Sequence, residues 1–491
     1  MKSYQDRSPR AIGDGLARGG VCAAGKRVAG YCLRVAMKQP FLLALGRALL
    51  KPFPQLSGRL YQIAHRSGNT HSPLALESFG VVPDRDLSGP KQILVDLTLI
   101  AEKDLGTGIQ RVVRAVLQSM LDDPPLDYAI EPVRFLKDKG YVYTQMGGDI
   151  PARVPQVQPA SVSGGDVFLG LDLCPEISEM LPWLEVYKKK GAQLVFVVYD
   201  ILPLLKPQLF DQAVASAMVA WLRSVSEIAD GLVCISKTVA DEVCEWLNSE
   251  RANIQRTHSL PIGVFHLGAD FQSNQPATKQ AFAPPGFLVV GTIEPRKGHA
   301  QALAAMELLW EQGVDVSLIF CGKKGWMVDD FIRQLEGHPE LKRRLFWFDA
   351  ASDETLESLY ASSRALLVPS VGEGFGLPLI EAARFGLPLI LRDLPVFREI
   401  AGDHAYYFQG ETPGSLADAL CAWLSLGEAV ADSSDIKWLS WHESSKQLLA
   451  TFLNDQWYRF WPDAGTDNRS GETVRSQRIA SASPPSTPQL S

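Results

Sequence analysis

The sequence contains no long apolar run, and this absence limits the kinds of protein it can encode. No segment reaches the roughly 18–20 apolar residues that a membrane-spanning helix requires. The apolar run at 41–45 is short and lies late for a secretory signal peptide. An excess of positive charge is also lacking, since the net charge is −7. We therefore expect a cytoplasmic protein that binds no nucleic acid.

The spacing of cysteine and histidine indicates neither a disulfide framework nor a metal site. The cysteines are odd in number, scattered and without a Cys-x-x-Cys pair. They are Cys22, Cys32, Cys174, Cys234, Cys244, Cys321 and Cys421. The eight histidines are isolated, and no Asp-x-Asp pair lies in a plausible loop. We expect buried, reduced thiols and no bound metal.

Basic charge is concentrated near the N-terminus. Residues 1–75 hold twelve Lys or Arg and two acids, Asp6 and Asp14, which gives this arm about +10 and the remainder about −17. A short helix with basic residues at its edges is predicted at 41–51. The arm favours contact with an anionic membrane surface. The alternatives are a helical pair packed on the globular body and a misassigned upstream start.

From about residue 91, short apolar runs alternate with longer helical patterns. Apolar runs bounded by turn residues predict strands buried on both faces of a parallel sheet. We place strands at 93–97, 166–170, 193–199, 231–235, 286–291, 316–321, 344–348, 365–369 and 387–391, and helices at 109–120, 209–229, 237–249, 299–312, 353–361 and 376–385. The polar stretch 270–285 predicts a linker, and the chain is long enough for two α/β units of Rossmann size.

The strongest local signal is the segment Glu373-Gly-Phe-Gly-Leu-Pro-Leu-Ile-Glu381. It follows a predicted strand and opens a helix, and Gly374 and Gly376 permit close backbone approach there. Free N–H groups at a helix N-terminus suit an anionic ligand. The carboxylates of Glu373 and Glu381 can accept hydrogen bonds from sugar and ribose hydroxyls. A plain strand–helix turn with a capping acid is the alternative interpretation.

A second turn between a predicted strand and a helix lies at 289–298. Its Arg296 and Lys297 project where a bound diphosphate would need neutralising charge. Cations at a helix start oppose the helix dipole, so this placement favours function over a solvated helix start.

A third glycine turn, Gly106-Thr-Gly-Ile-Gln-Arg111, follows the first predicted strand. It does not complete Gly-x-Gly-x-x-Gly, so the fingerprint of a dinucleotide-binding oxidoreductase fails. By itself, the turn is a weak signal for a sugar or phosphate loop.

Together, these turns resemble those of retaining family-4 glycosyltransferases of the GT-B type. The spacing Glu373-x7-Glu381 resembles the signature of that family, and the resemblance covers about 91–460. Further matching segments are 291–298, 320–326, 353–360, 394–402 and 438–445. The resemblance implies an α/β fold with two Rossmann-like domains, a cleft between them and C-terminal helices that cross back to the first domain.

The resemblance also implies a division of the chain and a reaction. The expected parts are a basic extension at 1–90, an acceptor domain at 91–272, a donor-nucleotide domain at 273–437, closing helices at 438–463 that pack on the acceptor domain and a disordered tail at 464–491. The implied reaction is sugar transfer from a nucleoside-diphosphate sugar with retention of anomeric configuration. No metal or other cofactor is expected, because the sugar nucleotide is a co-substrate.

Roles can be carried over to the residues that match the family pattern. Lys297, with Arg296 beside it, would bind the donor diphosphate, and Glu373 would hold hydroxyls of the transferred sugar. The other expected donor-binding positions are the backbone of Gly374, Phe375 and Gly376, the carboxylate of Glu381 at the nucleotide ribose, and Gly108 across the cleft.

Two positions depart from the family pattern. Many members have Arg where this chain has Thr292, which leaves one fewer cation for the leaving group. Many members have His where this chain has Tyr199. We therefore take Asp200 as the candidate residue on the acceptor side, and Thr292 as a position that lines the donor site.

Two other functions stay open: a GT-B nucleotide-sugar epimerase and a non-catalytic sugar-nucleotide-binding protein. The paired acids and the basic arm favour sugar transfer to a membrane-borne acceptor. The motifs resemble bacterial enzymes of surface-polysaccharide assembly, commonly mannosyl- or rhamnosyltransferases. We favour GDP-mannose as the donor and a glycan or lipid-linked glycan as the acceptor, with the protein peripheral on the inner face of the cytoplasmic membrane.

Overall fold

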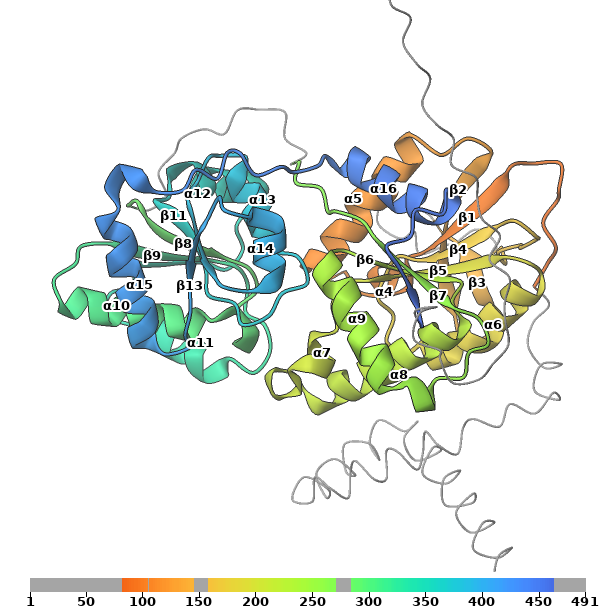
Figure 1. Cartoon of the computed structure of the whole chain (residues 1–491), viewed down its shortest axis with the longest axis horizontal. Helices are drawn as coiled ribbons and strands as arrows, with labels where there is room; N and C mark the ends of the chain where they lie inside the picture. Colours follow the sequence, from red (N-terminus) through yellow and green to blue (C-terminus); the bar gives the residue numbers. More distant parts are fainter. Residues whose placement is uncertain (1–81, 105, 145–157, 271–283, 463–491) are drawn as a thin grey trace, which may run out of the picture. The chain divides into compact units, whose positions relative to one another are not determined.

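The structure, a computed structural model, describes residues 82–104, 106–144, 158–270 and 284–462. The predicted basic arm, most of the predicted linker and the predicted tail lie outside these residues. Among the helices that are described, none is long and apolar enough to cross a membrane. Two sheets of mainly parallel strands, each with helices on both faces, form what we call the first lobe and the second lobe (Figure 1).

The first lobe is built on a sheet of eight described strands in the order β14-β7-β6-β5-β4-β1-β2-β3. The edge pairs β14–β7 and β2–β3 are antiparallel, and the strands between them are parallel. The strands are β1 (Lys91–Asp96), β2 (Tyr128–Leu136), β3 (Gly140–Tyr143), β4 (Val167–Gly170), β5 (Gln193–Val198), β6 (Gly231–Cys234), β7 (Leu260–Val264) and β14 (Arg459–Trp461).

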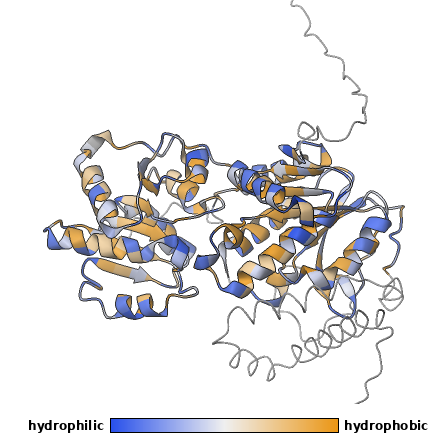
Figure 2. Ribbon diagram, turned by 60° about the horizontal axis from the view of Figure 1, so that its bottom comes forward, coloured by the Kyte–Doolittle hydropathy of each residue, from blue (hydrophilic) through white to orange (hydrophobic). Residues whose placement is uncertain are grey.

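Helices cover both faces of this sheet because successive strand residues point to opposite sides. In β5, Val195 and Val197 pack with the core of α5 and α16, whereas Leu194 and Phe196 pack with that of α6, α8 and α9. The apolar colour is concentrated on the strands and on the inner faces of the helices (Figure 2). The helices are α4 (Thr98–Glu102), α5 (Gly108–Asp122), α6 (Ile177–Lys189), α7 (Leu202–Leu205), α8 (Gln212–Ile228), α9 (Lys237–Ser249) and α16 (Trp441–Leu453).

The second lobe contains a sheet of six described strands, all parallel, in the order β10-β9-β8-β11-β12-β13. This is the strand order of a dinucleotide-binding Rossmann sheet. The strands are β8 (Gly286–Val290), β9 (Ser317–Cys321), β10 (Leu345–Phe348), β11 (Ala365–Val368), β12 (Leu389–Arg392) and β13 (Tyr406–Phe408).

Both faces of the second sheet are covered as well (Figure 1). Phe287 and Val289 of β8 face the core that holds α10, α11 and α15, whereas Leu288 faces the core of α12, α13 and α14. The helices are α10 (His299–Glu311), α11 (Asp329–Glu336), α12 (Asp353–Ser362), α13 (Leu377–Ala383), α14 (Pro395–Ala401) and α15 (Pro413–Ser425).

After α15 the chain returns to the first lobe. Helix α16 packs on α5, where the hydroxyls of Ser119 and Ser445 lie 2.7 Å apart. A capping box of Ser440 and Glu443 fixes the start of α16. Strand β14 then pairs with β7 at the sheet edge. The last described segment thereby ties the second lobe to the first.

Candidate active site

The order of the second sheet determines where a ligand can bind. The chain winds from β8 toward β10 on one side and from β11 toward β13 on the other, so β8 and β11 flank the reversal point. Ligands of open α/β sheets bind at such a point, at the carboxyl ends of the strands. The segments 291–298 and 369–376 follow β8 and β11. Two of the segments singled out from the sequence therefore come together there.

The charged side chains of these two loops contact each other directly. Lys297 Nζ lies 2.6 Å from Glu373 Oε1, and Arg296 Nη1 lies 2.9 Å from Glu373 Oε2. Arg296 Nε also lies 2.6 Å from a carboxylate oxygen of Glu294. Glu294 and Glu373 are buried. The two predicted diphosphate-binding cations thus hold the predicted sugar-binding carboxylate between them.

The two buried glutamates differ in their pKa. Burial alone would raise the pKa of Glu373, but Lys297 and Arg296 outweigh it and lower the pKa to about 2. For Glu294, burial outweighs the same two cations and raises the pKa to about 7. Near neutral pH the cluster therefore combines two cations, one carboxylate and one carboxyl group that titrates.

This charge balance suits an anionic ligand. The ammonium of Lys297 has three N–H donors, of which the contact with Glu373 uses one. The others can donate to phosphate oxygens. Lys297 is also fixed in place, since it ends a short 3-10 turn, Pro295–Lys297, immediately before α10. Cations that are already fixed close to a leaving diphosphate stabilise the negative charge that develops on it.

The backbone at Gly374 touches the first lobe, and this position requires glycine. A Cβ added there would lie 2.2 Å from the carbonyl oxygen of Tyr199. The Ser236 hydroxyl donates a 2.8 Å hydrogen bond to the carbonyl of Gly374. Gly376 has a φ of 101° and is the N-cap of α13, a conformation that L side chains rarely adopt. The glycine pattern therefore reflects both a close approach and a left-handed turn.

Phe375, between these glycines, points into the core. Its side chain is 3% exposed. Its ring packs edge to face on the ring of His266, with the two ring centroids 4.7 Å apart. The predicted contribution of Phe375 through its backbone is compatible with this position.

The predicted ribose-binding residue Glu381 is buried in α13 and already has two partners. Arg111 Nη1 of α5 lies 2.6 Å from Glu381 Oε1, and the Tyr360 hydroxyl donates to Oε2 at 2.7 Å. Neither partner is predictable from the sequence pattern. Arg111 was part of the third glycine turn, but nothing in that motif indicated which acid it would meet.

The residues that follow β5 form the part of the first lobe that lies against the loop at Gly374. Tyr199 is buried, and its hydroxyl donates to the carbonyl of Leu171 at 2.8 Å. Its side chain therefore belongs to the core of the first lobe. Asp200 lies next to the second lobe, because a Cβ added at Gly374 would be 3.0 Å from Asp200 Cβ. Burial raises the pKa of Asp200, and Arg296 opposes this effect.

The two remaining predicted positions lie at the edges of the site. Gly108 is exposed at the start of α5, and nothing lies within 4 Å of the place where a Cβ would stand. Thr292 packs against the next loop, since a Cβ added at Gly325 would be 2.8 Å from Thr292 Cγ2. Neither residue belongs to the cluster formed by Arg296, Lys297 and Glu373.

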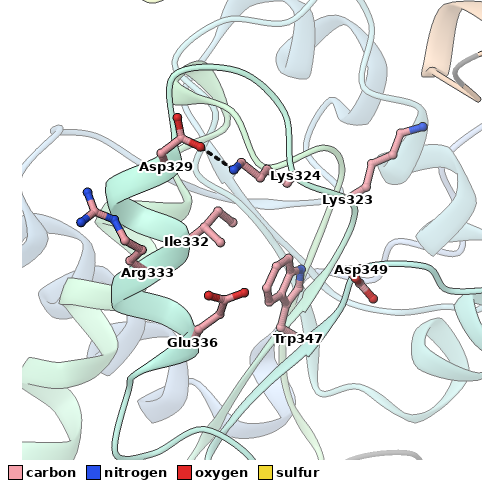
Figure 3. A pocket seen from close by; sticks show the side chains of 8 residues that line it. All are labelled: Lys323, Lys324, Asp329, Ile332, Arg333, Glu336, Trp347 and Asp349. Atoms are coloured by element: carbon pink, nitrogen blue, oxygen red, sulfur yellow. Dashed lines mark ion pairs between the residues drawn. The ribbon is translucent and has the colours of Figure 1, made fainter.

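A cavity of about 590 Å³ lies beyond the ends of β9 and β10 in the second lobe. Trp347 and the α11 side chains Ile332 and Glu336 line it, and Lys324 pairs with Asp329 at its rim (Figure 3). The indole N–H of Trp347 donates to the carbonyl of Gly322 at 2.9 Å. None of the predicted site residues lines this cavity.

Comparison with solved structures identifies the architecture. The chain superposes on sucrose-phosphate synthase from Thermosynechococcus elongatus with a TM-score of 0.51, at 17% identity, over 74% of this chain and 98% of that chain. It also superposes on the catalytic domain of starch synthase IV from Arabidopsis thaliana, bound to ADP and acarbose, with a TM-score of 0.52, at 13% identity, over 75% and 99%. The chain has the GT-B fold. The predicted fold class is confirmed.

Similarity in sequence agrees with the GT-B fold. Residues 271–435 match the family model described as "Glycosyl transferases group 1". The chain is 41% identical over 374 residues to the serotype-specific mannosyltransferase WbdA of Escherichia coli. That match covers 73% of this chain and 44% of WbdA. The chain thus spans less than half the length of this curated relative.

Proposed function

We propose that the chain is a retaining family-4 glycosyltransferase that transfers mannose from GDP-mannose to a glycan or lipid-linked glycan in polysaccharide biosynthesis. The observation that carries the proposal is the cluster of Arg296, Lys297 and Glu373 at the reversal point of the second sheet. The similarity to a mannosyltransferase supports mannose as the transferred sugar. The match to glycosyltransferases group 1 supports sugar transfer over epimerisation.

In this proposal the second lobe holds the donor. Lys297 and Arg296 bind the diphosphate, Glu373 accepts hydrogen bonds from hydroxyls of the sugar, and Glu381 accepts from the ribose. The backbone of the loop 374–376 approaches the sugar and phosphate. Positive charge that is already in place stabilises the charge that develops on the departing diphosphate.

The proposed chemical step is a substitution on one face of the donor sugar. The bond between the anomeric carbon and the β-phosphate oxygen breaks, and its electron pair stays on that oxygen. The acceptor oxygen bonds to the anomeric carbon on the same face, and its proton passes to a β-phosphate oxygen. The products are a retained glycoside and the nucleoside diphosphate. No metal or enzymic nucleophile takes part.

The acceptor is proposed to approach along the first lobe, beside Asp200. The sequence supports a membrane-borne acceptor through the basic residues of 1–75, which would hold the protein at the inner face of the cytoplasmic membrane. Co-sedimentation with liposomes that contain anionic lipid tests this part. The full chain should sediment and the chain without residues 1–75 should not, whereas equal sedimentation would remove the membrane proposal.

A screen of sugar nucleotides tests the donor assignment. The purified chain is incubated with an oligomannoside acceptor and GDP-mannose, UDP-glucose, ADP-glucose or dTDP-rhamnose in the presence of EDTA, and binding of each donor and release of nucleoside diphosphate are measured. We expect release from GDP-mannose, with loss in Lys297→Ala and Glu373→Ala. Release from another donor alone would correct the sugar. Absence of binding to every sugar nucleotide would contradict the proposed function.

A further inference from the structure

The carboxylate of Glu381 is held by one residue from each lobe. Arg111 of the first lobe contacts Oε1 at 2.6 Å, and Tyr360 of the second lobe donates to Oε2 at 2.7 Å. The Glu381 side chain is 3% exposed and that of Arg111 is 34% exposed. The ion pair thus joins a buried acid to a cation at the edge of the other lobe.

Local structure in α5 fixes Arg111 in place. The helix begins with a capping box in which Thr107 and Gln110 satisfy each other's backbone N–H groups. The Gln110 side chain also donates to the carbonyl of Lys103 at 2.8 Å. Arg111 follows directly, within about one turn of the helix start. A cation there is unfavourable for the helix dipole, so the needs of α5 do not account for it.

The two contacts leave room on the carboxylate for a further ligand. An ionised carboxylate has about four acceptor positions, two on each oxygen. Arg111 uses one on Oε1, and Tyr360 uses one on Oε2. One position on each oxygen is left for other donors. A vicinal diol carries two O–H donors and matches this remaining pair.

The opposite charge of Arg111 matters because Glu381 is buried. A buried carboxylate without a cation is strongly unfavourable, and removal of one partner of such a pair leaves an uncompensated charge. Tyr360 is neutral, and burial raises its pKa well above the ordinary value. The charge of Glu381 is therefore balanced from the first lobe.

We infer that Arg111 is a positioning residue of the donor site, which holds the Glu381 carboxylate in the orientation that accepts both hydroxyls of the nucleotide ribose. The inference rests on the proposed function, in which Glu381 binds the ribose. It assigns part of the selection of ribonucleotides over deoxyribonucleotides to the first lobe. Donor binding and the contact between the lobes are thereby coupled at one carboxylate.

Binding of GDP and 2′,3′-dideoxy-GDP, measured by calorimetry on the full chain, tests the inference. A hydrogen bond to a charged group contributes about 1.5–3 kcal/mol, so the wild-type chain should prefer GDP by at least about tenfold. In Arg111→Gln the preference should fall below about threefold, mainly through weaker binding of GDP. Arg111→Lys should restore part of the preference.

Arg114→Gln is the matched control. Arg114 lies one turn further along α5 and pairs with Asp104 of its own lobe. This variant should keep the wild-type preference, and thermal unfolding should show that every variant is folded.

Four results separate the inference from the proposed function. An unchanged preference in Arg111→Gln, or tighter GDP binding because Arg111 competes with the ribose, would overturn the inference alone. Loss of the preference in Glu381→Gln would support the ribose assignment. If the wild-type chain binds neither GDP nor any other nucleoside diphosphate, the proposed function fails and the inference with it.

Discussion

Lys297 and Glu373 follow adjacent parallel strands of the second sheet, and Lys297 Nζ lies 2.6 Å from Glu373 Oε1. The residues are 76 positions apart in the sequence. The strand order alone brings them together, because β8 and β11 are neighbours at the reversal point of the sheet. The cation proposed for the diphosphate and the acid proposed for the sugar are therefore assembled before any ligand binds.

Replacement of Lys297 by Met should slow sugar transfer by about 10²–10³-fold, as loss of a fixed electrostatic partner of a transition state does. The substitution removes the ammonium and keeps an unbranched side chain. Lys324→Met is the control, because Lys324 is half exposed and pairs with Asp329 outside the cluster. Rates at saturating donor measure the effect. Equal losses in the two variants would mean that the position of Lys297 has no special role.

Donor affinity should weaken as the pH rises through about 7, because Glu294, with a pKa of about 7, becomes a second carboxylate in the cluster. If the bound diphosphate raises this pKa by about one unit, binding at pH 6 is about fivefold tighter than at pH 8. In the free protein Glu294 keeps its proton up to about pH 7, whereas in the unfolded chain it loses the proton above about pH 4.5. The free energy of unfolding therefore falls as the pH rises from about 4.5 to 7. Glu294→Gln should flatten the dependence of GDP-mannose affinity on pH. A slope that persists in this variant would show that another group causes the pH dependence.

Gly374→Ala should reduce both activity and stability. The added Cβ would meet the carbonyl oxygen of Tyr199 at 2.2 Å, so backbone must shift at a cost of about 1–3 kcal/mol. Gly414→Ala is the counterpart: it lies in α15 with open space around its Cβ position and should stabilise by about 0.5–1 kcal/mol. Denaturant unfolding and transfer rates measure both. Full activity in Gly374→Ala would show that the lobes need not approach at this loop.

Glu399→Ala should weaken the contact between the lobes without unfolding either one. The Glu399 carboxylate of α14 accepts hydrogen bonds from the backbone N–H groups of Lys237 and Thr238 and from the Thr238 hydroxyl, at the start of α9. Loss of a helix-capping acid costs about 1 kcal/mol, which corresponds to about a fivefold change in the equilibrium between lobes in contact and lobes apart. The donor KM should rise by about that factor.

Glu336→Ala, which removes an exposed glutamate of α11, is the comparison for Glu399→Ala. It should leave KM unchanged. A similar KM in both variants would show that the contact of Glu399 with α9 does not affect donor binding.

The sequence was sufficient for nine of the parallel strands, because strands buried on both faces are continuous apolar runs. It did not predict the parallel strands β7 and β13, nor the edges of the first sheet. Strand β2 has Pro132 within it and is only partly buried, so it lacks such a run, and its hairpin partner β3 has four residues. The helices α4, α6, α7, α11, α14 and α15 were also not predicted. Pro182 interrupts α6, and α4, α7, α11 and α14 have eight residues or fewer.

The residues of the site were predictable to the extent that they lie in motifs after strands. The grouping of Arg296, Lys297 and Glu373 follows from the strand order, which local patterns do not contain. Tyr199 points to the same side of the sheet as Val197, because the two residues are two positions apart. Which side this is becomes clear only when the helices that cover the sheet are known. Arg111 and Glu381 meet across lobes, and no spacing along the chain encodes that contact.

The anomeric configuration of the product is the sharpest test of the proposed retaining transfer of mannose. The full chain is incubated with GDP-mannose and an oligomannoside acceptor in EDTA, and the new linkage is examined by NMR. We expect an added mannose in α-linkage, the configuration of the donor, and no product from Glu373→Ala. A β-linked product, or an oligomannoside left unchanged while GDP-mannose is bound, would contradict it.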